Sequence, residues 1–167
     1  MVRCCVAYHS KWGNCREVAE IVGNVVGDFG HSVEIVDFKA VRLSPAPFDF
    51  IALGSPTRFG RSSRQMRRFI ANELPHVQKG TPFAAYGTGM EPEAGVHISH
   101  AAEDIHRLLV GFELRPIVEP FTAILDGPRG PLADGEFERA AKFGLEIGDL
   151  LNWPGLSGFS GGMAVGF

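Results

Sequence analysis

Short apolar runs alternate along the chain with segments whose apolar residues recur at helical spacing. Each run ends in glycine, serine or proline, as buried strands commonly do before a loop. Strands are predicted at 2–8, 32–38, 48–53 and 81–86, and a fifth within 113–124, which two prolines restrict to a sheet edge. Helices are predicted over 17–26, 64–74, 99–110 and from a cap at Asp134 to Leu151.

Five strands separated by helices, with no internal repeat, predict an open α/β sheet covered by helices on both faces. The 167 residues fit one domain, expected at 1–151, followed by a glycine-rich tail at 152–167. In sheets of this type ligands bind beyond the carboxyl ends of the strands. The loops at 9–15, 54–62 and 87–96 are therefore the candidate binding segments.

Charge and cysteine content narrow the range of partners. The 16 basic and 19 acidic residues give a formal net charge of −3, which supplies no field that would attract nucleic acid. Arginines cluster at 61–68, where a solvated helix face is the expected role and a docking surface the alternative. Three cysteines near the amino terminus do not form a disulfide framework, so a reducing cytoplasm is the expected location. No run approaches the roughly 20 apolar residues of a membrane span.

The first candidate loop has the chemistry of a phosphate site. It joins a buried strand to a helix, so backbone N–H groups converge at a helix amino end. Gly13 permits close backbone approach, Ser10 and Asn14 offer hydrogen bonds, and Lys11 adds positive charge. The alternative is a helix cap with nothing bound, because serine and asparagine are also common caps. The patterns G-x-G-x-x-G and G-x-x-x-x-G-K-[ST] are both absent from the chain.

Two motifs in the correct order carry a family resemblance. S-x-x-G-N in the first loop resembles the FMN phosphate loop of flavodoxins, which commonly carry S-x-T-G-N-T. The run GSPTRFG follows the third strand, where flavodoxin-like proteins place the turn that binds the isoalloxazine ring. The fuller run GSPTRFGRSSRQMRRFI is similar to a segment of the NAD(P)H:quinone oxidoreductases first described as tryptophan-repressor-binding proteins. Trp12 stands where that family has an aromatic residue beside the nicotinamide site.

The resemblance implies a flavodoxin-like three-layer sandwich with a five-stranded parallel sheet in the order 2-1-3-4-5, and one FMN at its carboxyl edge. A flavin is flat and amphiphilic, so it needs apolar or aromatic faces and hydrogen bonds at its pyrimidine edge. Phe59 and Trp12 offer such faces. The candidate cofactor-binding residues are Ser10, Lys11, Trp12, Gly13, Asn14, Cys15, Pro56, Thr57, Arg58, Phe59, Gly60, Gly87, Thr88 and Gly89.

Three functions are open on the sequence alone. The favoured one is an FMN redox protein that passes electrons to a protein partner and needs no catalytic side chain. The alternative is an NAD(P)H:quinone oxidoreductase, in which NAD(P)H is the electron donor and a homo-oligomer completes the substrate pocket. The third is a binding module that kept the fold without the cofactor. No metal site is expected, because His97 and His100 lack companion ligands.

Overall fold

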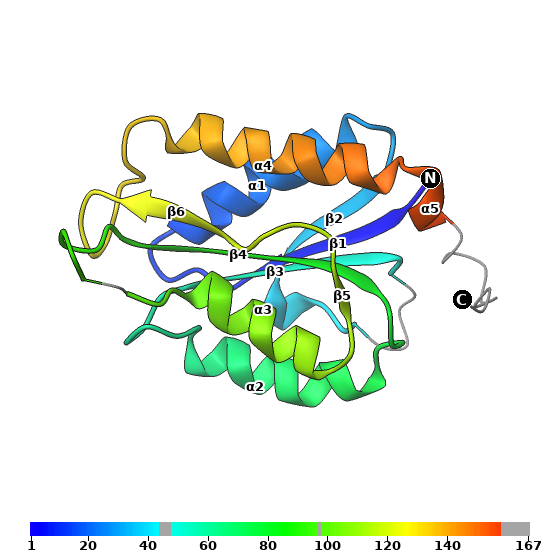
Figure 1. Ribbon diagram of the computed structural model, residues 1–167, viewed down its shortest axis with the longest axis horizontal. Coiled ribbons are helices and arrows are strands. Elements are labelled where there is room, and N and C mark those ends of the chain that lie inside the picture. The colour runs from blue at the N-terminus through cyan, green and yellow to red at the C-terminus, as the bar shows by residue number, and fades with distance from the viewer. Residues whose placement is uncertain (44–47, 97, 158–167) are drawn as a thin grey trace.

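One parallel β-sheet runs through the middle of the protein (Figure 1). The computed structural model describes residues 1–43, 48–96 and 98–157. The strands are β1 (Arg3–Tyr8), β2 (Ser32–Asp37), β3 (Phe50–Pro56), β4 (Pro82–Met90), β5 (Arg115–Pro116) and β6 (Phe121–Leu125). Their order is β2-β1-β3-β4-β5, and β6 also pairs with β4. The predicted order 2-1-3-4-5 is confirmed, with a sixth strand in addition.

Helices cover both faces of this sheet (Figure 1). On one face α1 (Asn14–Gly27) lies beside α4 (Glu136–Leu151), and the other face carries α2 (Arg64–Glu73) and α3 (Ala101–Gly111). The short helical segments are η1 (Phe38–Ala40), η2 (Leu74–His76) and α5 (Pro154–Ser157). The three-layer sandwich is therefore confirmed.

Alternation along the central strands divides the hydrophobic core into two layers. In β1, Cys4 and Val6 belong to the layer beneath α1 and α4, whereas Cys5 and Ala7 belong to the layer beneath α2 and α3. Successive side chains of a strand point to opposite faces of the sheet. Because helices bury both faces, the central strands β1 and β3 are largely apolar, whereas the edge strand β2 alternates with polar residues.

The single edge strand predicted at 113–124 is wrong, because the structure has two short strands there. β5 pairs with Pro82 and Phe83 at the beginning of β4, and β6 pairs with the second half of β4 from Tyr86 onward. Pro120 has no N–H group to donate, so the ladder is interrupted immediately before β6. The carboxyl end of β6 reaches the same sheet edge as those of β3 and β4, which adds a fourth connection to that edge.

The starts of two helices also differ from expectation. α1 begins at Asn14, not at Glu17. α4 begins after Gly135 and has no side-chain cap, so the predicted cap at Asp134 is wrong. Both helices follow a left-handed glycine, with φ of 90° at Gly13 and 84° at Gly135. Glycine reaches this conformation at no steric cost, so the chain can turn into each helix without a capping side chain.

The expected boundary between domain and tail coincides with the end of α4 at Leu151. Ten of the tail residues, 158–167, lie outside the described part of the chain, so the boundary stays a prediction. Within the described residues, no helix is both long and apolar enough to cross a membrane.

All three cysteines are expected to be unreactive in the folded protein. Cys4, Cys5 and Cys15 are free thiols in the core, and burial raises the pKa of Cys4 and Cys5 to about 12 and that of Cys15 further. At pH 8 a thiol with that pKa is thiolate in only about one molecule in ten thousand, and thiolate is the reactive form. Labelling with Ellman's reagent should therefore release no signal over minutes in buffer and three equivalents in guanidinium chloride. Rapid reaction of one thiol in the native protein would contradict this assignment.

Candidate functional site

A cleft opens at the carboxyl edge of the sheet, where four connections between strands and helices meet. Its volume is about 260 Å³, close to the lower end of the roughly 300–1,000 Å³ typical of ligand pockets. The walls come from the connection after β1, the ends of β3 and β4, the segment before α3 and the end of β6. The three loops expected to converge do so, as the rule for open α/β sheets predicts.

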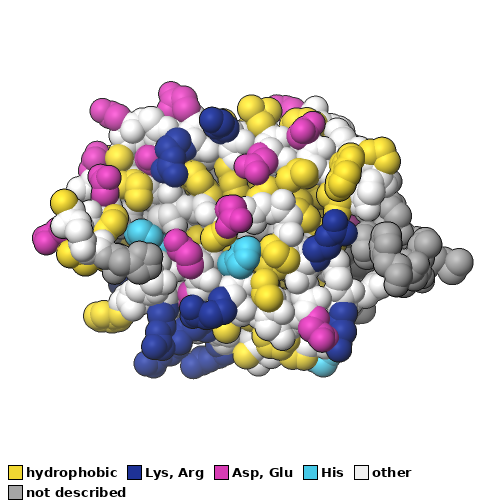
Figure 2. All heavy atoms as spheres, viewed as in Figure 1, with side chains coloured by type: hydrophobic (Ala, Val, Ile, Leu, Met, Phe, Trp, Pro, Cys, Tyr) yellow, Lys and Arg dark blue, Asp and Glu magenta, His cyan; other side chains and the backbone are white. Residues whose placement is uncertain are grey.

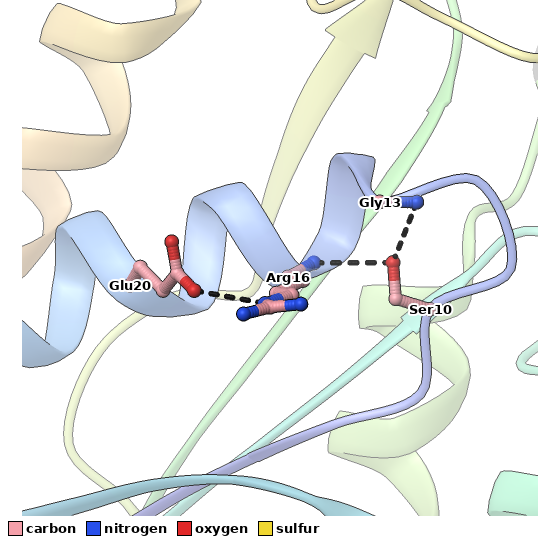
Figure 3. A network of polar contacts seen from close by, with 4 residues as sticks. All are labelled: Ser10, Gly13, Arg16 and Glu20. Carbon is pink, nitrogen blue, oxygen red and sulfur yellow. Dashed lines mark hydrogen bonds and ion pairs between the residues drawn. The ribbon is translucent and has the colours of Figure 1, made fainter.

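The connection after β1 is organised by a serine hydroxyl (Figure 3). Ser10 Oγ accepts hydrogen bonds from the backbone N–H groups of Gly13 at 3.1 Å and Arg16 at 3.3 Å. The hydroxyl therefore caps α1 from the loop that precedes it, although Ser10 lies outside the helix. Because Oγ acts as acceptor in both bonds, its own hydrogen stays available to a ligand.

The amino end of α1 also presents unpaired amides. The first N–H groups of a helix have no partner within the helix. Ser10 satisfies those of Gly13 and Arg16, but within the described chain the N–H groups of Asn14 and Cys15 have no protein acceptor. Both residues line the cleft. Two free amides at a helix amino end are suited to an anion such as a phosphate.

The side chain of Asn14 holds a fourth segment against the cleft. Its Nδ2 donates to the backbone carbonyl of Arg129 at 3.0 Å, which ties the start of α1 to the connection after β6. Gly130 packs so closely that a Cβ atom there would lie 2.4 Å from Asn14 Oδ1. Asn14 was expected to offer its hydrogen bonds to a ligand, whereas the structure uses the amide side chain to join two loops.

The connection after β3 forms a tight two-residue turn beside the cleft. Arg58 and Arg61 exchange two backbone hydrogen bonds of 2.8 and 3.0 Å, and Phe59 and Gly60 between them have φ of 51° and 75°. A bulky residue with positive φ is uncommon and costs about 1–3 kcal/mol. The Phe59 ring is 103% exposed and does not line the cleft, whereas Pro56, Thr57 and Arg58 do.

The third predicted loop is part of a strand. Gly87, Thr88 and Gly89 continue β4 and pair with β6. Thr88 and Gly89 line the cleft, and a Cβ atom on Gly89 would lie 2.5 Å from the His100 ring. His100 is itself held in place by a 2.9 Å hydrogen bond between Nε2 and the Met90 carbonyl. Gly87 and Thr88 pair with β3 as well as with β6, and β6 extends the pairing to Gly89 and Met90.

Positive charge gathers around the aromatic wall of the cleft. Trp12 is 46% exposed, with Lys11 Nζ 5.3 Å and the Arg129 guanidinium carbon 4.8 Å from its ring centroid. Both distances are within the range of cation–π attraction. Arg58 also lines the cleft. The site thus combines an apolar face with cations that favour an anionic ligand.

Ten of the fourteen residues predicted from the sequence line the cleft. They are Ser10, Lys11, Trp12, Asn14, Cys15, Pro56, Thr57, Arg58, Thr88 and Gly89. Gly13, Phe59, Gly60 and Gly87 do not line it. Of these, Gly13 and Gly60 form turns with positive φ, and Gly87 lies so close to β3 that a Cβ would be 2.5 Å from the Ser55 carbonyl.

Sequence reasoning missed five residues of the cleft wall. They are Met90, Ile98, His100, Leu125 and Pro128. The signal that could have found Leu125 and Pro128 was the apolar run 121–125 ending in glycine and proline, which is the same pattern that marked the other strand ends. Among the described residues there is no cluster of three histidine, cysteine, aspartate or glutamate side chains that could hold a metal ion.

Replacing Thr57 by valine is expected to loosen the start of α3. Thr57 Oγ1 accepts a 2.9 Å hydrogen bond from the backbone N–H of Ala101, the first residue of α3. Valine keeps the shape but leaves that amide unsatisfied, which should cost about 1–2 kcal/mol of unfolding free energy. Urea denaturation measures the loss, and Thr57→Ser, which keeps the acceptor, is the control. Equal destabilisation in both variants would show that packing, and not the hydrogen bond, matters at this position.

These features define a class of protein: a parallel α/β sandwich with a ligand cleft at the carboxyl edge and a helix amino end suited to an anion. A model of the flavodoxin domain family matches residues 5–96, and the chain belongs to this family.

Solved structures with this fold span most of the chain. An archaeal flavodoxin superimposes with a TM-score of 0.74 at 21% identity, covering 88% of this chain and 96% of its own. A flavodoxin described as a WrbA-like protein from Agrobacterium tumefaciens superimposes with a TM-score of 0.65 at 16% identity, covering 90% and 97%. The rubredoxin oxygen:oxidoreductase of Desulfovibrio gigas reaches a TM-score of 0.73 at 15% identity, covering 94% of this chain but 36% of its own. These similarities establish a common fold.

Proposed function

We propose that this protein binds FMN in the cleft and transfers electrons through it. The observation that carries the proposal is the amino end of α1, where the free amides of Asn14 and Cys15 and the Ser10 hydroxyl converge on one side of the cleft. A terminal phosphate fits these donors, because backbone N–H groups and a helix amino end favour negative charge. The cofactor-binding unit is proposed to be residues 1–151.

The remaining cleft residues fit a flavin ring. Bound FMN would supply the group that accepts and donates electrons. Trp12 offers an aromatic face, and Pro56, Thr57 and Arg58 border the place where backbone groups can hydrogen-bond the ring edge. Thr88 and Gly89 belong to the β4 part of the cleft wall, and the His100 ring fills the space that a side chain on Gly89 would take. Phe59, on the adjacent turn, is proposed to cover the ring from outside.

A two-electron NAD(P)H:quinone oxidoreductase is the second candidate. The run P-T-R-F-G and the aromatic Trp12 favour it. Lys11 and Arg58 line the cleft, Arg129 lies over the Trp12 ring, and these cations suit an anionic donor such as NADPH. The proposed location is the cytoplasm, since all three thiols are free.

Spectroscopy of the purified protein tests these proposals in one series. Yellow protein, or quenching of added FMN fluorescence, is expected, with weaker binding of riboflavin because it lacks the phosphate. If anaerobic titration with dithionite reduces the flavin in two separate one-electron steps, the electron carrier is favoured. Rapid bleaching by NADPH, followed by recovery with a quinone, would favour the oxidoreductase. Colourless protein that does not quench FMN would overturn both and leave the cofactor-free binding module.

A further inference from the structure

Five arginines without an intervening carboxylate lie between the cleft and the first half of α2. They are Arg58, Arg61, Arg64, Arg67 and Arg68, and the segment 58–68 that contains them is here called the arginine surface. Figure 2 shows basic side chains gathered at the lower left, over the region where Figure 1 draws the start of α2. The rest of the chain carries eleven basic and nineteen acidic residues, so this surface opposes the charge of the remainder.

The charge of this surface is not neutralised within the protein. Across the described residues, none of its arginines forms an ion pair, and Arg67 Nε is buried without a hydrogen-bond partner. The nearby carboxylate of Asp104 is already bound to Ser62 and Arg107. The segments outside the described residues contain no aspartate or glutamate. Arg61, Arg64 and Arg68 are therefore exposed cations available to a partner.

The arginine surface begins at the cleft itself. Arg58 lines the cleft, and Phe59, fully exposed with φ of 51°, projects from the same turn. An exposed aromatic ring beside arginines is the composition typical of the residues that dominate protein–protein binding. Helical spacing places Arg64 and Arg68 on one face of α2, so the positive charge extends outward from the cleft opening.

We propose that the arginine surface docks an acidic redox protein and positions it over the cleft. The inference rests on the proposed function, because it assumes that electrons pass through this cleft. Complementary charge accelerates encounter between proteins and orients them, and the effect weakens as salt screens it. The net charge of −3 alone predicts a basic partner, whereas the arginine surface predicts an acidic one.

Binding and electron transfer to two probe proteins test the proposal. The probes are an acidic [2Fe–2S] ferredoxin and cytochrome c, which is basic. Titration of the ¹⁵N-labelled protein with the ferredoxin is expected to shift amide resonances of residues 58–68, and this measurement does not require bound flavin. The rate at which the reduced ferredoxin transfers an electron to the oxidised flavin-loaded protein should fall about tenfold between low and high salt.

Charge reversal on α2 provides the decisive variant. Arg64→Glu with Arg68→Glu should slow the ferredoxin reaction at low salt by about 10- to 100-fold and remove most of its salt dependence. The matched control is Lys142→Glu, to be compared with Arg68→Glu. It makes the same charge change on α4, on the other face of the sheet, and should have little effect on the rate. If the double reversal does not fold, the neutral Arg64→Gln with Arg68→Gln replaces it, with an expected decrease of about tenfold.

Several results would overturn the proposal. One is a ferredoxin reaction whose rate and salt dependence are unaffected by charge reversal, together with a reaction of the reduced flavin-loaded protein with cytochrome c that slows as salt rises. If the only effect of charge reversal is loss of binding to phosphatidylserine vesicles, the surface binds lipid. If its only effect is dissociation of a self-associated species in light scattering, the surface binds a second copy of the chain. Failure to bind FMN would contradict the proposed function, whereas bound FMN with no ferredoxin shifts at 58–68 would contradict only the docking surface.

Discussion

Gly54→Ala is expected to destabilise the protein by about 3 kcal/mol, the upper part of the range for overpacking a filled core. A Cβ at Gly54 would lie 2.1–2.5 Å from three atoms of the Tyr86 ring. That ring is fully buried and its hydroxyl donates a 2.8 Å hydrogen bond to the Ala7 carbonyl, so it has no room to move. For a chain of this length the melting temperature should fall by roughly 6–12 °C, which calorimetry can measure.

The clash with Tyr86 can be separated from a general loss of stability by a double-mutant cycle. Gly54→Ala should cost about 1–2 kcal/mol less in a Tyr86→Leu background, because the clashing ring is gone. Tyr86→Phe keeps the ring and should give no relief. Gly111→Ala, at the end of α3 where an added Cβ meets nothing within 4 Å, should be close to neutral. Additive effects in the leucine background would refute the steric explanation.

Ser10→Ala should weaken FMN binding by about 10- to 100-fold, since a hydrogen bond to a charged group contributes about 1.5–3 kcal/mol. The substitution removes the hydroxyl proposed to donate to the phosphate. It also releases the amides of Gly13 and Arg16, which Ser10 Oγ now holds in place (Figure 3). Isothermal titration of the apoprotein with FMN gives the dissociation constant.

Riboflavin is the internal control for this experiment, because it has the ring without the phosphate. The affinity for riboflavin should change by less than about threefold in Ser10→Ala, because riboflavin has no phosphate for the Ser10 hydroxyl to bind. Ser32→Ala, an exposed serine in β2, should leave both affinities unchanged. If Ser10→Ala weakened riboflavin and FMN equally, the first loop would be acting through overall order of the cleft and not through the phosphate.

Much of the site could be predicted because its parts are local in sequence. Ser10 and Gly13 lie three residues apart in one turn, and the strand that ends before them is visible as an apolar run. Such local patterns depend on hydrophobic burial and turn chemistry, which act between near neighbours. The rule that parallel strands present their carboxyl ends at one edge then places separate loops together without coordinates.

The details that could not be predicted depend on contacts between distant residues. Asn14 and Arg129 are 115 positions apart, and nothing in either local sequence shows that the amide side chain bonds the other loop. The pairing of β6 with the end of β4 also joins distant residues, and together with the pairing to β3 it makes a strand of the expected loop at 87–89. Phe59 is exposed and has a positive φ, and the family motif reveals neither property.

The sequence by itself determined that the chain forms an open α/β sheet and at which edge its loops meet, because periodicity and strand-end chemistry are encoded locally. The family resemblance of two motifs implied the strand order, and ten of the residues chosen on these grounds line the cleft. Only the tertiary structure decided which amides at the start of α1 stay unpaired and which loop Asn14 holds. It also decided that the arginines of α2 have no internal partner in the described chain. Hydrogen bonds and ion pairs form between whichever groups the packed helices and strands bring within about 3–4 Å, and that proximity is a property of the assembled fold.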